Sequence, residues 1–270
     1  MSNVQPFQPR RPARERVLCL HSSASSGRQW RPMIDAWAGR FEVLAPELLG
    51  YGGGERWPTG TPVSLDAEAQ ALAPLLQRQP VHLVGHSYGG AVALQIALRW
   101  PDRVSSLTLY EPVRFALLSR NPATQAAGEV IVGIGRRIGM QVLSGRLHAA
   151  AERFVDYWSG EGTWAQLDER RRAALAERMP KVQAEFEALF ADRVPAAAYD
   201  GLTMPVQLIG GSRSPLPARQ VLDVLSARWP HAVRTTLAGL GHMGPVDAPL
   251  RVLAATAASP GAIGALPHAA

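Results

Sequence analysis

The sequence predicts an α/β fold, in which a mostly parallel sheet has helices on both faces. Short apolar runs of strand length alternate with stretches whose apolar residues recur at helical spacing. The 270 residues are too many for one small domain and too few for two independent ones, and 47% of them are hydrophobic. Such a chain can bury a sizeable core, and the alternation is typical of a sheet covered on both sides.

The first part of the chain contains four strand candidates separated by helix candidates. The run RVLCLH, residues 16–21, is almost wholly apolar, which predicts a strand buried on both faces. The other strand candidates are residues 41–47, 80–86 and 104–112, and the helix candidates are residues 28–38, 65–77 and 89–101. This order predicts three consecutive strand–helix–strand units.

The pattern changes at residue 113 and returns near residue 201. Residues 113–200 are predicted to be helical, with breaks at Gly145, residues 160–162 and Pro180. Strand candidates at 204–211 and 232–239 follow, with helix candidates at 217–229 and 249–257. We therefore expect a core of residues 16–112 and 201–258, interrupted by a helical cap at residues 113–200. Residues 1–15 and 259–270 are predicted to be flexible.

Composition argues against several kinds of partner. The formal charge is +6, but the basic residues are dispersed and no aromatic residues alternate with them, which argues against nucleic acid. No apolar run approaches the roughly 20 residues of a membrane span, and the N-terminus has no apolar signal segment. Cys19 is the only cysteine, so an intrachain disulfide is excluded. We expect a cytoplasmic protein with no membrane partner; the sequence leaves the oligomeric state open.

The motif GHSYGG, residues 85–90, matches G-x-S-x-G with Ser87 at its centre. A strand candidate precedes it and a helix candidate follows, so the serine lies on a tight, strained turn. The N-terminus of the helix then directs amide groups toward charge that develops at Ser87. This context predicts a nucleophile; the alternative is an exposed serine that caps the helix.

A general base and two oxyanion donors are expected at the same edge of the sheet. His242 follows the last strand candidate in a glycine-rich loop, a position that none of the other six histidines shares. The backbone N–H of Tyr88, directly after Ser87, is one expected donor. The N–H of Ser23, in the loop after the first strand, is the other, with Ser22 as the fallback. A structural histidine and an ordinary polar loop are the alternatives.

Four segments resemble the ordered landmarks of the α/β-hydrolase superfamily: LHSSASSGRQW (20–30), APELLGYG (45–52), GHSYGG and GLGHM (239–243). The resemblance implies a mostly parallel eight-stranded sheet, a lid over the site, and hydrolysis through an acyl-enzyme on serine. It also implies the chain order of nucleophile first and histidine last. Two departures occur. Ser22 follows His21 where the family usually has glycine, and Glu47 stands where it usually has aspartate.

The catalytic acid is not where this family usually carries it. That segment reads VQLIGGSRSP, residues 206–215, and contains no carboxylate. Glu111 ends the strand that follows the nucleophile strand, one inter-strand step of about 4.8 Å from either neighbour. Some α/β-hydrolases carry the acid one strand earlier, after the strand that follows the nucleophile strand, and this chain resembles them. Glu111 is therefore the predicted acid. The alternatives are a structural glutamate paired with Arg114 or capping a helix, and a triad that lacks an acid.

Other carboxylates fit the position less well. Asp102 and Asp200 precede strands, Glu47 lies on the other side of the nucleophile strand, Asp223 is inside a helix, and Asp247 is expected to start the final helix.

These residues predict a serine hydrolase that acts on small-molecule carboxylic esters. Ser87 attacks the carbonyl, His242 transfers the proton, and Glu111 holds the imidazole in the correct tautomer. The mechanism requires no metal and no organic cofactor. We expect small or medium apolar acyl groups, with one or two of the six aromatic cap residues (Phe154, Tyr157, Trp158, Trp164, Phe186 and Phe190) facing the pocket. The alternatives are a C–C bond hydrolase on the same triad and a non-catalytic ligand-binding protein.

Overall fold

The computed structural model describes residues 14–54, 57 and 60–257, so almost all of the predicted flexible ends lies outside the described residues. Six strands form one sheet in the order β2-β1-β3-β4-β5-β6, and every neighbouring pair is parallel. The strands are β1 (Arg16–Leu20), β2 (Glu42–Leu44), β3 (Val81–His86), β4 (Val104–Tyr110), β5 (Val206–Gly211) and β6 (Val233–Leu237). Each predicted strand is therefore confirmed.

The expectation of eight strands is wrong for the described part of the chain. Most connections between the six strands contain helices, and in the long connection from β2 to α2 the described residues 45–54, 57 and 60–64 form no strand. The outermost strand β2 has only three residues, all half-buried. The strands β1, β3 and β4, which precede Ser23, Ser87 and Glu111, are inner strands, whereas β6, which precedes His242, is an edge strand. All four are present, so the smaller number leaves the site intact.

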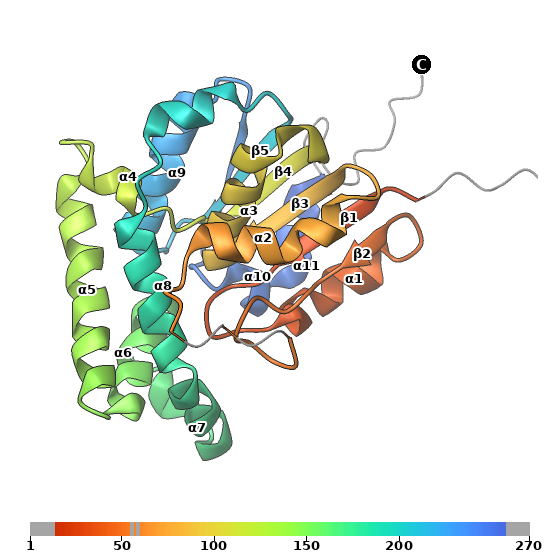
Figure 1. Ribbon diagram of the computed structural model, residues 1–270. Coiled ribbons are helices and arrows are strands. Elements are labelled where there is room, and N and C mark those ends of the chain that lie inside the picture. The colour runs from red at the N-terminus through yellow and green to blue at the C-terminus, as the bar shows by residue number, and fades with distance from the viewer. Residues whose placement is uncertain (1–13, 55–56, 58–59, 258–270) are drawn as a thin grey trace, which may run out of the picture.

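Helices cover both faces of the sheet, as predicted (Figure 1). The alternation of side chains along β1 shows the two layers. Val17 and Cys19 pack in one apolar cluster with side chains of α1 (Arg31–Trp37) and α11 (Pro249–Ala257). Leu18 and Leu20 pack in the other with α2 (Leu65–Leu76), α3 (Tyr88–Arg99) and α9 (Leu216–Arg228). Both clusters are buried, so the sheet forms the middle layer of the core.

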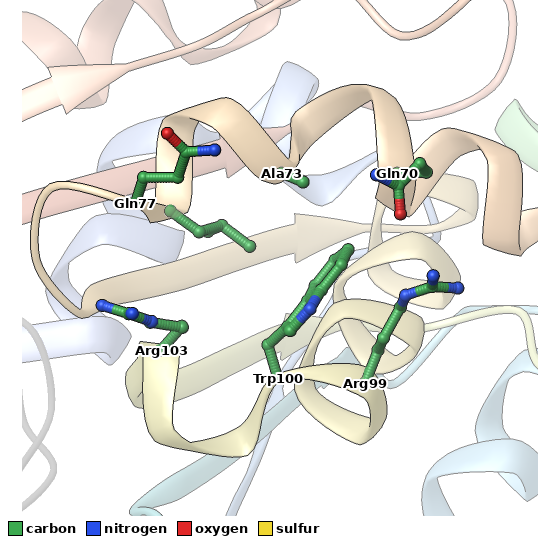
Figure 2. A pocket seen from close by; sticks show the side chains of 7 residues that line it. Gln70, Ala73, Gln77, Arg99, Trp100 and Arg103 are labelled. Carbon is green, nitrogen blue, oxygen red and sulfur yellow. The ribbon is translucent and has the colours of Figure 1, made fainter.

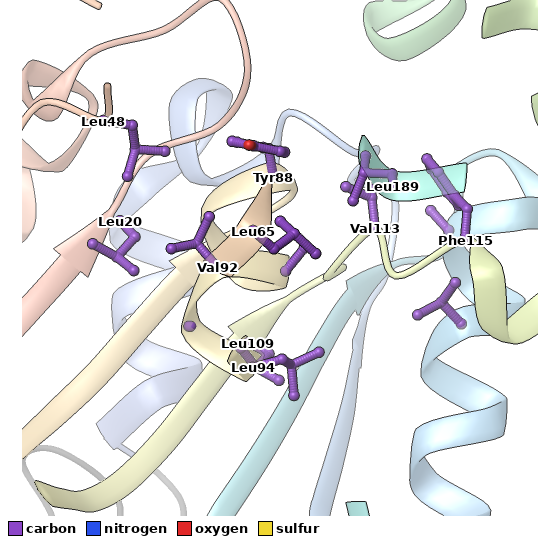
Figure 3. Packing of buried hydrophobic residues seen from close by; sticks show 14 of the residues in the cluster. Leu20, Leu48, Leu65, Tyr88, Val92, Leu94, Leu109, Val113, Phe115 and Leu189 are labelled. Atoms are coloured by element: carbon purple, nitrogen blue, oxygen red, sulfur yellow. The ribbon is translucent and has the colours of Figure 1, made fainter. Parts of the chain in front are cut away.

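Between β4 and β5 the chain forms the helices α4 (Ala116–Ser119), α5 (Gln125–Leu143), α6 (Leu147–Ser159), α7 (Glu169–Glu177) and α8 (Met179–Ala191). The predicted breaks are confirmed: Gly145 separates α5 from α6, residues 160–162 follow α6, and Pro180 lies in the first turn of α8. Helices α5 to α8 gather to one side of the sheet (Figure 1). The apolar cluster beside α3 continues past Val113 and Phe115 to Leu189 of α8 (Figure 3).

A fully buried arginine joins this helical region to the core. The Arg114 side chain donates to Asp192 Oδ2 (2.6 Å), to the Ala91 carbonyl (3.0 Å) and to Gln95 Oε1 (2.8 Å). Asp192 follows α8, whereas Ala91 and Gln95 belong to α3. Because Arg114 pairs with Asp192, it is not the partner of Glu111, which removes one of the structural alternatives for that glutamate.

Candidate active site

Ser87 lies on the turn between β3 and α3 with backbone angles φ 55° and ψ −119°. Side-chain-bearing residues rarely adopt a positive φ, which costs of order 1–3 kcal/mol and persists only where the surroundings hold it. Here the Ser87 N–H donates to the Tyr110 carbonyl (3.0 Å), and the Ser87 carbonyl accepts from Val113 N–H (3.3 Å). At Gly89, a Cβ would lie 2.3 Å from the Leu20 carbonyl oxygen, so only glycine allows α3 to start so close to β1.

His242 lies in the loop between β6 and α10 (Gly244–Asp247), with its ring beside the serine. Its Nε2 is 2.9 Å from Ser87 Oγ, and the residue is almost fully buried. The Tyr110 hydroxyl donates to the Gly241 carbonyl at 2.7 Å, which restrains the loop next to His242. The centroid of the Trp158 ring, on α6, lies 4.1 Å from the centroid of the imidazole. The imidazole is therefore restrained both through its loop and through its ring.

Glu111 follows β4 directly and reaches His242, which follows β6, past the end of the intervening strand β5. Its Oε2 is 2.6 Å from His242 Nδ1, and its Oε1 accepts from Gly211 N–H at 2.7 Å. The carboxylate is fully buried, so these two donors are what compensates its desolvation. Glu111 itself has φ 46°, and its N–H donates to the Ile209 carbonyl of β5 (3.0 Å).

The hydrogen bonds determine which nitrogen of His242 carries the proton. An ionised carboxylate only accepts, so the bond to Glu111 requires a proton on Nδ1. The Nε2 lone pair then faces Ser87 Oγ, which is the arrangement that a general base needs.

The competing carboxylates lie elsewhere. Asp223 pairs with Arg234 at 2.5 Å, and Asp247 is exposed at the end of α10. The expectation that Asp247 starts the final helix is wrong, because α11 begins at Pro249. In residues 14–54, 57 and 60–257, Glu111 is the only carboxylate in hydrogen-bond contact with His242.

The loop after β1 leaves one amide free where an oxyanion donor is expected. The Ser22 N–H donates to Gln29 Oε1 and the Ala24 N–H to the Tyr51 hydroxyl, both at 3.1 Å. The Ser23 N–H donates to no residue that the structure describes. Tyr88 opens α3, and the first amides of a helix have no partner within it. The geometry thus favours Ser23 over the fallback Ser22.

A model of the α/β-hydrolase fold family matches residues 15–249. The chain belongs to the α/β-hydrolase family. It is similar to Lipase LipV of Mycobacterium tuberculosis, with 42% identity over 113 residues, which span 41% of each chain. It is 27% identical to a pimeloyl-(acyl-carrier protein) methyl ester esterase of Yersinia pseudotuberculosis, over 84% of this chain and 85% of that one. An esterase structure from Thermogutta terrifontis superposes with a TM-score of 0.71 at 20% identity, covering 90% and 88%.

In this α/β hydrolase a second histidine supports the first, a feature that sequence reasoning missed. His86 Nε2 is 2.8 Å from the His242 carbonyl, and His86 Nδ1 is 3.0 Å from Gln29 Nε2. Since Gln29 Oε1 accepts from Ser22 N–H, its amide group must donate to His86, whose Nε2 then donates to His242. Burial, with His242 nearby, lowers the pKa of His86 well below its usual value. A neutral His86 therefore connects the loop after β1 to the loop of His242.

A narrow pocket of the hydrolase opens beside Ser87 and Ser23. Its other walls come from α6, α8 and the segment after β4, and they are apolar except for Glu185. Three of the six aromatic residues singled out from the sequence, Phe154, Trp158 and Phe186, line it, which is more than the one or two expected. The helical spacing showed that these side chains lie on helices, but not which helix faces the core.

A larger hollow of the hydrolase, with about 670 Å³ of empty space, lies away from Ser87 (Figure 2). It lies between α2 and the end of α3, and its walls include Gln70, Trp100 and Arg103. None of its lining residues pairs a nucleophile with a base, so it is not the candidate active site.

Two further properties bear on ligands. Across the described parts of the hydrolase, no three His, Cys, Asp or Glu side chains form a group that could hold a metal ion. The described helices also include none with both the length and the apolar character needed to cross a membrane.

Proposed function

We propose that this α/β hydrolase cleaves carboxylic esters through an acyl-enzyme on Ser87. The observation that carries the proposal is the chain of contacts from Ser87 Oγ to His242 Nε2 (2.9 Å) and from His242 Nδ1 to Glu111 Oε2 (2.6 Å). His242 takes the serine proton as Oγ attacks the ester carbonyl, and then gives it to the leaving alcohol. Water attacks the acyl-enzyme in the same way, and the acid is released.

Glu111 and two backbone amides stabilise the charges that develop on His242 and on the substrate oxygen during the reaction. The carboxylate keeps the proton of His242 on Nδ1 and stabilises the imidazolium. The N–H groups of Tyr88 and Ser23 donate to the oxyanion of each tetrahedral intermediate. Both amides are held in place before the substrate arrives, by the start of α3 and by the neighbouring bonds of Ser22 and Ala24.

Residues 113–200 act as a cap that selects the acyl group. The pocket beside Ser87 is narrow and mostly apolar, which favours acyl groups of small or medium length. Two relatives carry the names of ester hydrolases, a lipase and a methyl ester esterase, which supports esters over other bonds.

A graded series of p-nitrophenyl esters, from acetate to palmitate, tests the proposal. We expect kcat/KM to be highest for short or medium chains and to be lost in Ser87→Ala. A rate that climbs steadily to palmitate would contradict the cap's role. Cleavage of a vinylogous diketone by a protein that leaves every ester intact would assign C–C bond hydrolysis instead, and failure to cleave either would favour a ligand-binding protein.

A further inference from the structure

Three charged side chains form a buried cluster between α2 and α8, at the wall of the pocket. Lys181 Nζ lies 2.8 Å from Glu68 Oε1 and 3.1 Å from Glu185 Oε1. Both carboxylate side chains are 1% exposed. The lysine ammonium also lies about 5 Å from the ring centres of Tyr51, Trp57 and Tyr88, so aromatic faces surround the rest of it. Glu185 of this cluster lines the same pocket as Ser87.

The two carboxylates are unequally satisfied. Glu68 Oε2 accepts from Leu49 N–H (3.0 Å), and its Oε1 accepts from Lys181 and from the Tyr88 hydroxyl (3.3 Å). Glu185 has Lys181 on Oε1, whereas its Oε2 is buried and accepts no hydrogen bond from the described residues. A buried acceptor without a donor is rare and destabilises the fold. Glu185 therefore has an acceptor to offer.

The charges of the cluster also indicate that a hydrogen-bond donor is missing. One ammonium faces two carboxylates, so the cluster needs further positive charge or hydrogen-bond donors. Burial, only partly offset by Lys181, raises the pKa of Glu68 above its usual value. For Lys181, burial acts to lower the pKa, but the Glu185 and Glu68 carboxylates together raise it, so the lysine stays charged and engaged. Its hydrogen bonds go to Glu68 Oε1 and Glu185 Oε1, and none of them reaches Glu185 Oε2.

Tyr51 is the nearest competing donor. Its hydroxyl already accepts from the Ala24 N–H, and burial, followed by the Glu185 carboxylate, raises the pKa of this phenol well above its usual value. A side-chain hydrogen bond with Glu185 also contributes to this rise in pKa, although no Tyr51 contact meets hydrogen-bond geometry at Glu185 Oε2. A test must therefore separate the two residues.

We propose that Glu185 Oε2 accepts a hydrogen bond from the substrate, and that the preferred acyl group is apolar except for one hydroxyl or ammonium group. The pocket includes Ser87 and the proposed oxyanion donor Ser23 but not His242, beside which the alcohol must leave. It is therefore the acyl group that occupies it. Apart from Ser23 and Ser87 at the reacting end, Glu185 is the only polar residue in its lining, so a single donor suffices. This inference rests on the proposed ester hydrolysis and names its substrate class.

Methyl esters of hexanoic acid test the proposal. One series carries a hydroxyl on carbon 3, 4, 5 or 6, and a matched series carries a methoxy group, which keeps the oxygen but cannot donate. Amino esters form a third arm that separates ammonium from hydroxyl. A site built to bind a donor discriminates strongly against the analogue that lacks it. We expect at least one position at which the donor raises kcat/KM by about tenfold or more over methoxy.

Variants assign that preference to Glu185. In Glu185→Met the preference should fall to near one, while Glu185→Gln, which retains one acceptor oxygen, should keep part of it. Glu187→Gln is the matched control, because Glu187 lies on the exposed face of the same helix and should change nothing. Tyr51→Phe should leave the preference in place; its loss there, but not in Glu185→Met, would assign the site to Tyr51 and overturn the proposal.

Two outcomes separate this inference from the proposed function. Hydrolysis of methyl hexanoate with equal rates for hydroxy, amino and methoxy esters would overturn the role of Glu185 and leave ester hydrolysis standing. If no ester is cleaved, calorimetry on Ser87→Ala still measures binding of the intact esters. Tighter binding of a donor-bearing ester, lost on Glu185→Met, would support the site while the proposed reaction fails. Equal binding would overturn the site as well.

Discussion

Replacing Glu111 by glutamine should disable the hydrolase while leaving its fold intact. Two N–H groups, those of Gly211 and His242, each require an acceptor from this side chain, at 2.7 and 2.6 Å. A glutamine offers one acceptor and one donor. If its oxygen faces Gly211, its amide group faces His242 Nδ1, and the imidazole must move its proton to Nε2. That proton then points at Ser87 Oγ, and the base is lost.

The opposite orientation of the amide is no better. The oxygen would face His242, but two N–H groups would meet at 2.7 Å at Gly211, which leaves a buried donor unsatisfied at a cost of about 1–3 kcal/mol. The corresponding change in a serine protease lowers kcat by about 10⁴, so we expect a loss of at least ~10² here. A drop in the free energy of unfolding of about 1–3 kcal/mol should accompany it.

Steady-state kinetics on p-nitrophenyl butyrate, with circular dichroism to confirm the fold, measures the loss. The double variant Glu111→Gln with Ser214→Asp returns a carboxylate to the segment where the family usually carries one. Ser214 is buried and its hydroxyl has no partner among the described residues, so we expect partial recovery. Ser212→Asp is the control, because Ser212 is exposed and its Oγ accepts from Gly239 N–H. Near-full activity in folded Glu111→Gln would refute the reasoning.

Two further predictions concern stability. Burial lowers the pKa of His21 to about 4 and that of His86 well below 6.5, so both are neutral in the fold. Their contribution is complete above the unfolded pKa of about 6.5 and is lost as pH falls, at about 2 kcal/mol each between pH 7 and pH 5. Urea titrations at pH 7 and pH 5 should show that His86→Gln loses about 2 kcal/mol less free energy of unfolding over this range than the native protein does. An equal loss in both proteins would contradict the prediction. At Gly244 a Cβ would lie 2.2 Å from the Tyr110 hydroxyl oxygen and 2.7 Å from the ring carbon Cζ, so Gly244→Ala should destabilise the fold by about 1–3 kcal/mol and lower kcat. Adding Tyr110→Phe should restore only part of this stability, because Cζ still crowds the new Cβ and the hydrogen bond to the Gly241 carbonyl is lost. Thermal melts of the single and double variants decide, and equal stability of Gly244→Ala and the native protein would count against it.

The sequence was sufficient for the parts of the site that depend on local pattern. A strand, a tight turn and a helix within residues 81–99 specify where Ser87 stands, and a glycine-rich loop after a strand specifies His242. Glu111 was reached by elimination, because the carboxyl ends of parallel strands meet at one edge and few carboxylates follow such a strand. Its positive φ, which directs the side chain toward β5, has no sequence signal in a glutamate.

The remaining features depend on contacts between distant segments. The choice between Ser22 and Ser23 is made by Gln29, which engages the Ser22 amide. The link from Gln29 through His86 to His242 joins the helical turn at residues 27–30, the end of β3 and the loop after β6, and no spacing within one segment reveals it. The orientation of α8, which brings Glu185 to the pocket, follows from packing. The number of strands was taken from the resemblance and was wrong for the described residues.

The central claim is that Ser87 is a nucleophile activated by His242. A fluorophosphonate probe, followed by intact-mass and peptide mass spectrometry, tests it without knowledge of the substrate. We expect one adduct per chain, located on Ser87, absent in Ser87→Ala and formed at least ~10²-fold more slowly in His242→Gln. Folded protein that remains unlabelled, or an adduct on another residue, would contradict it.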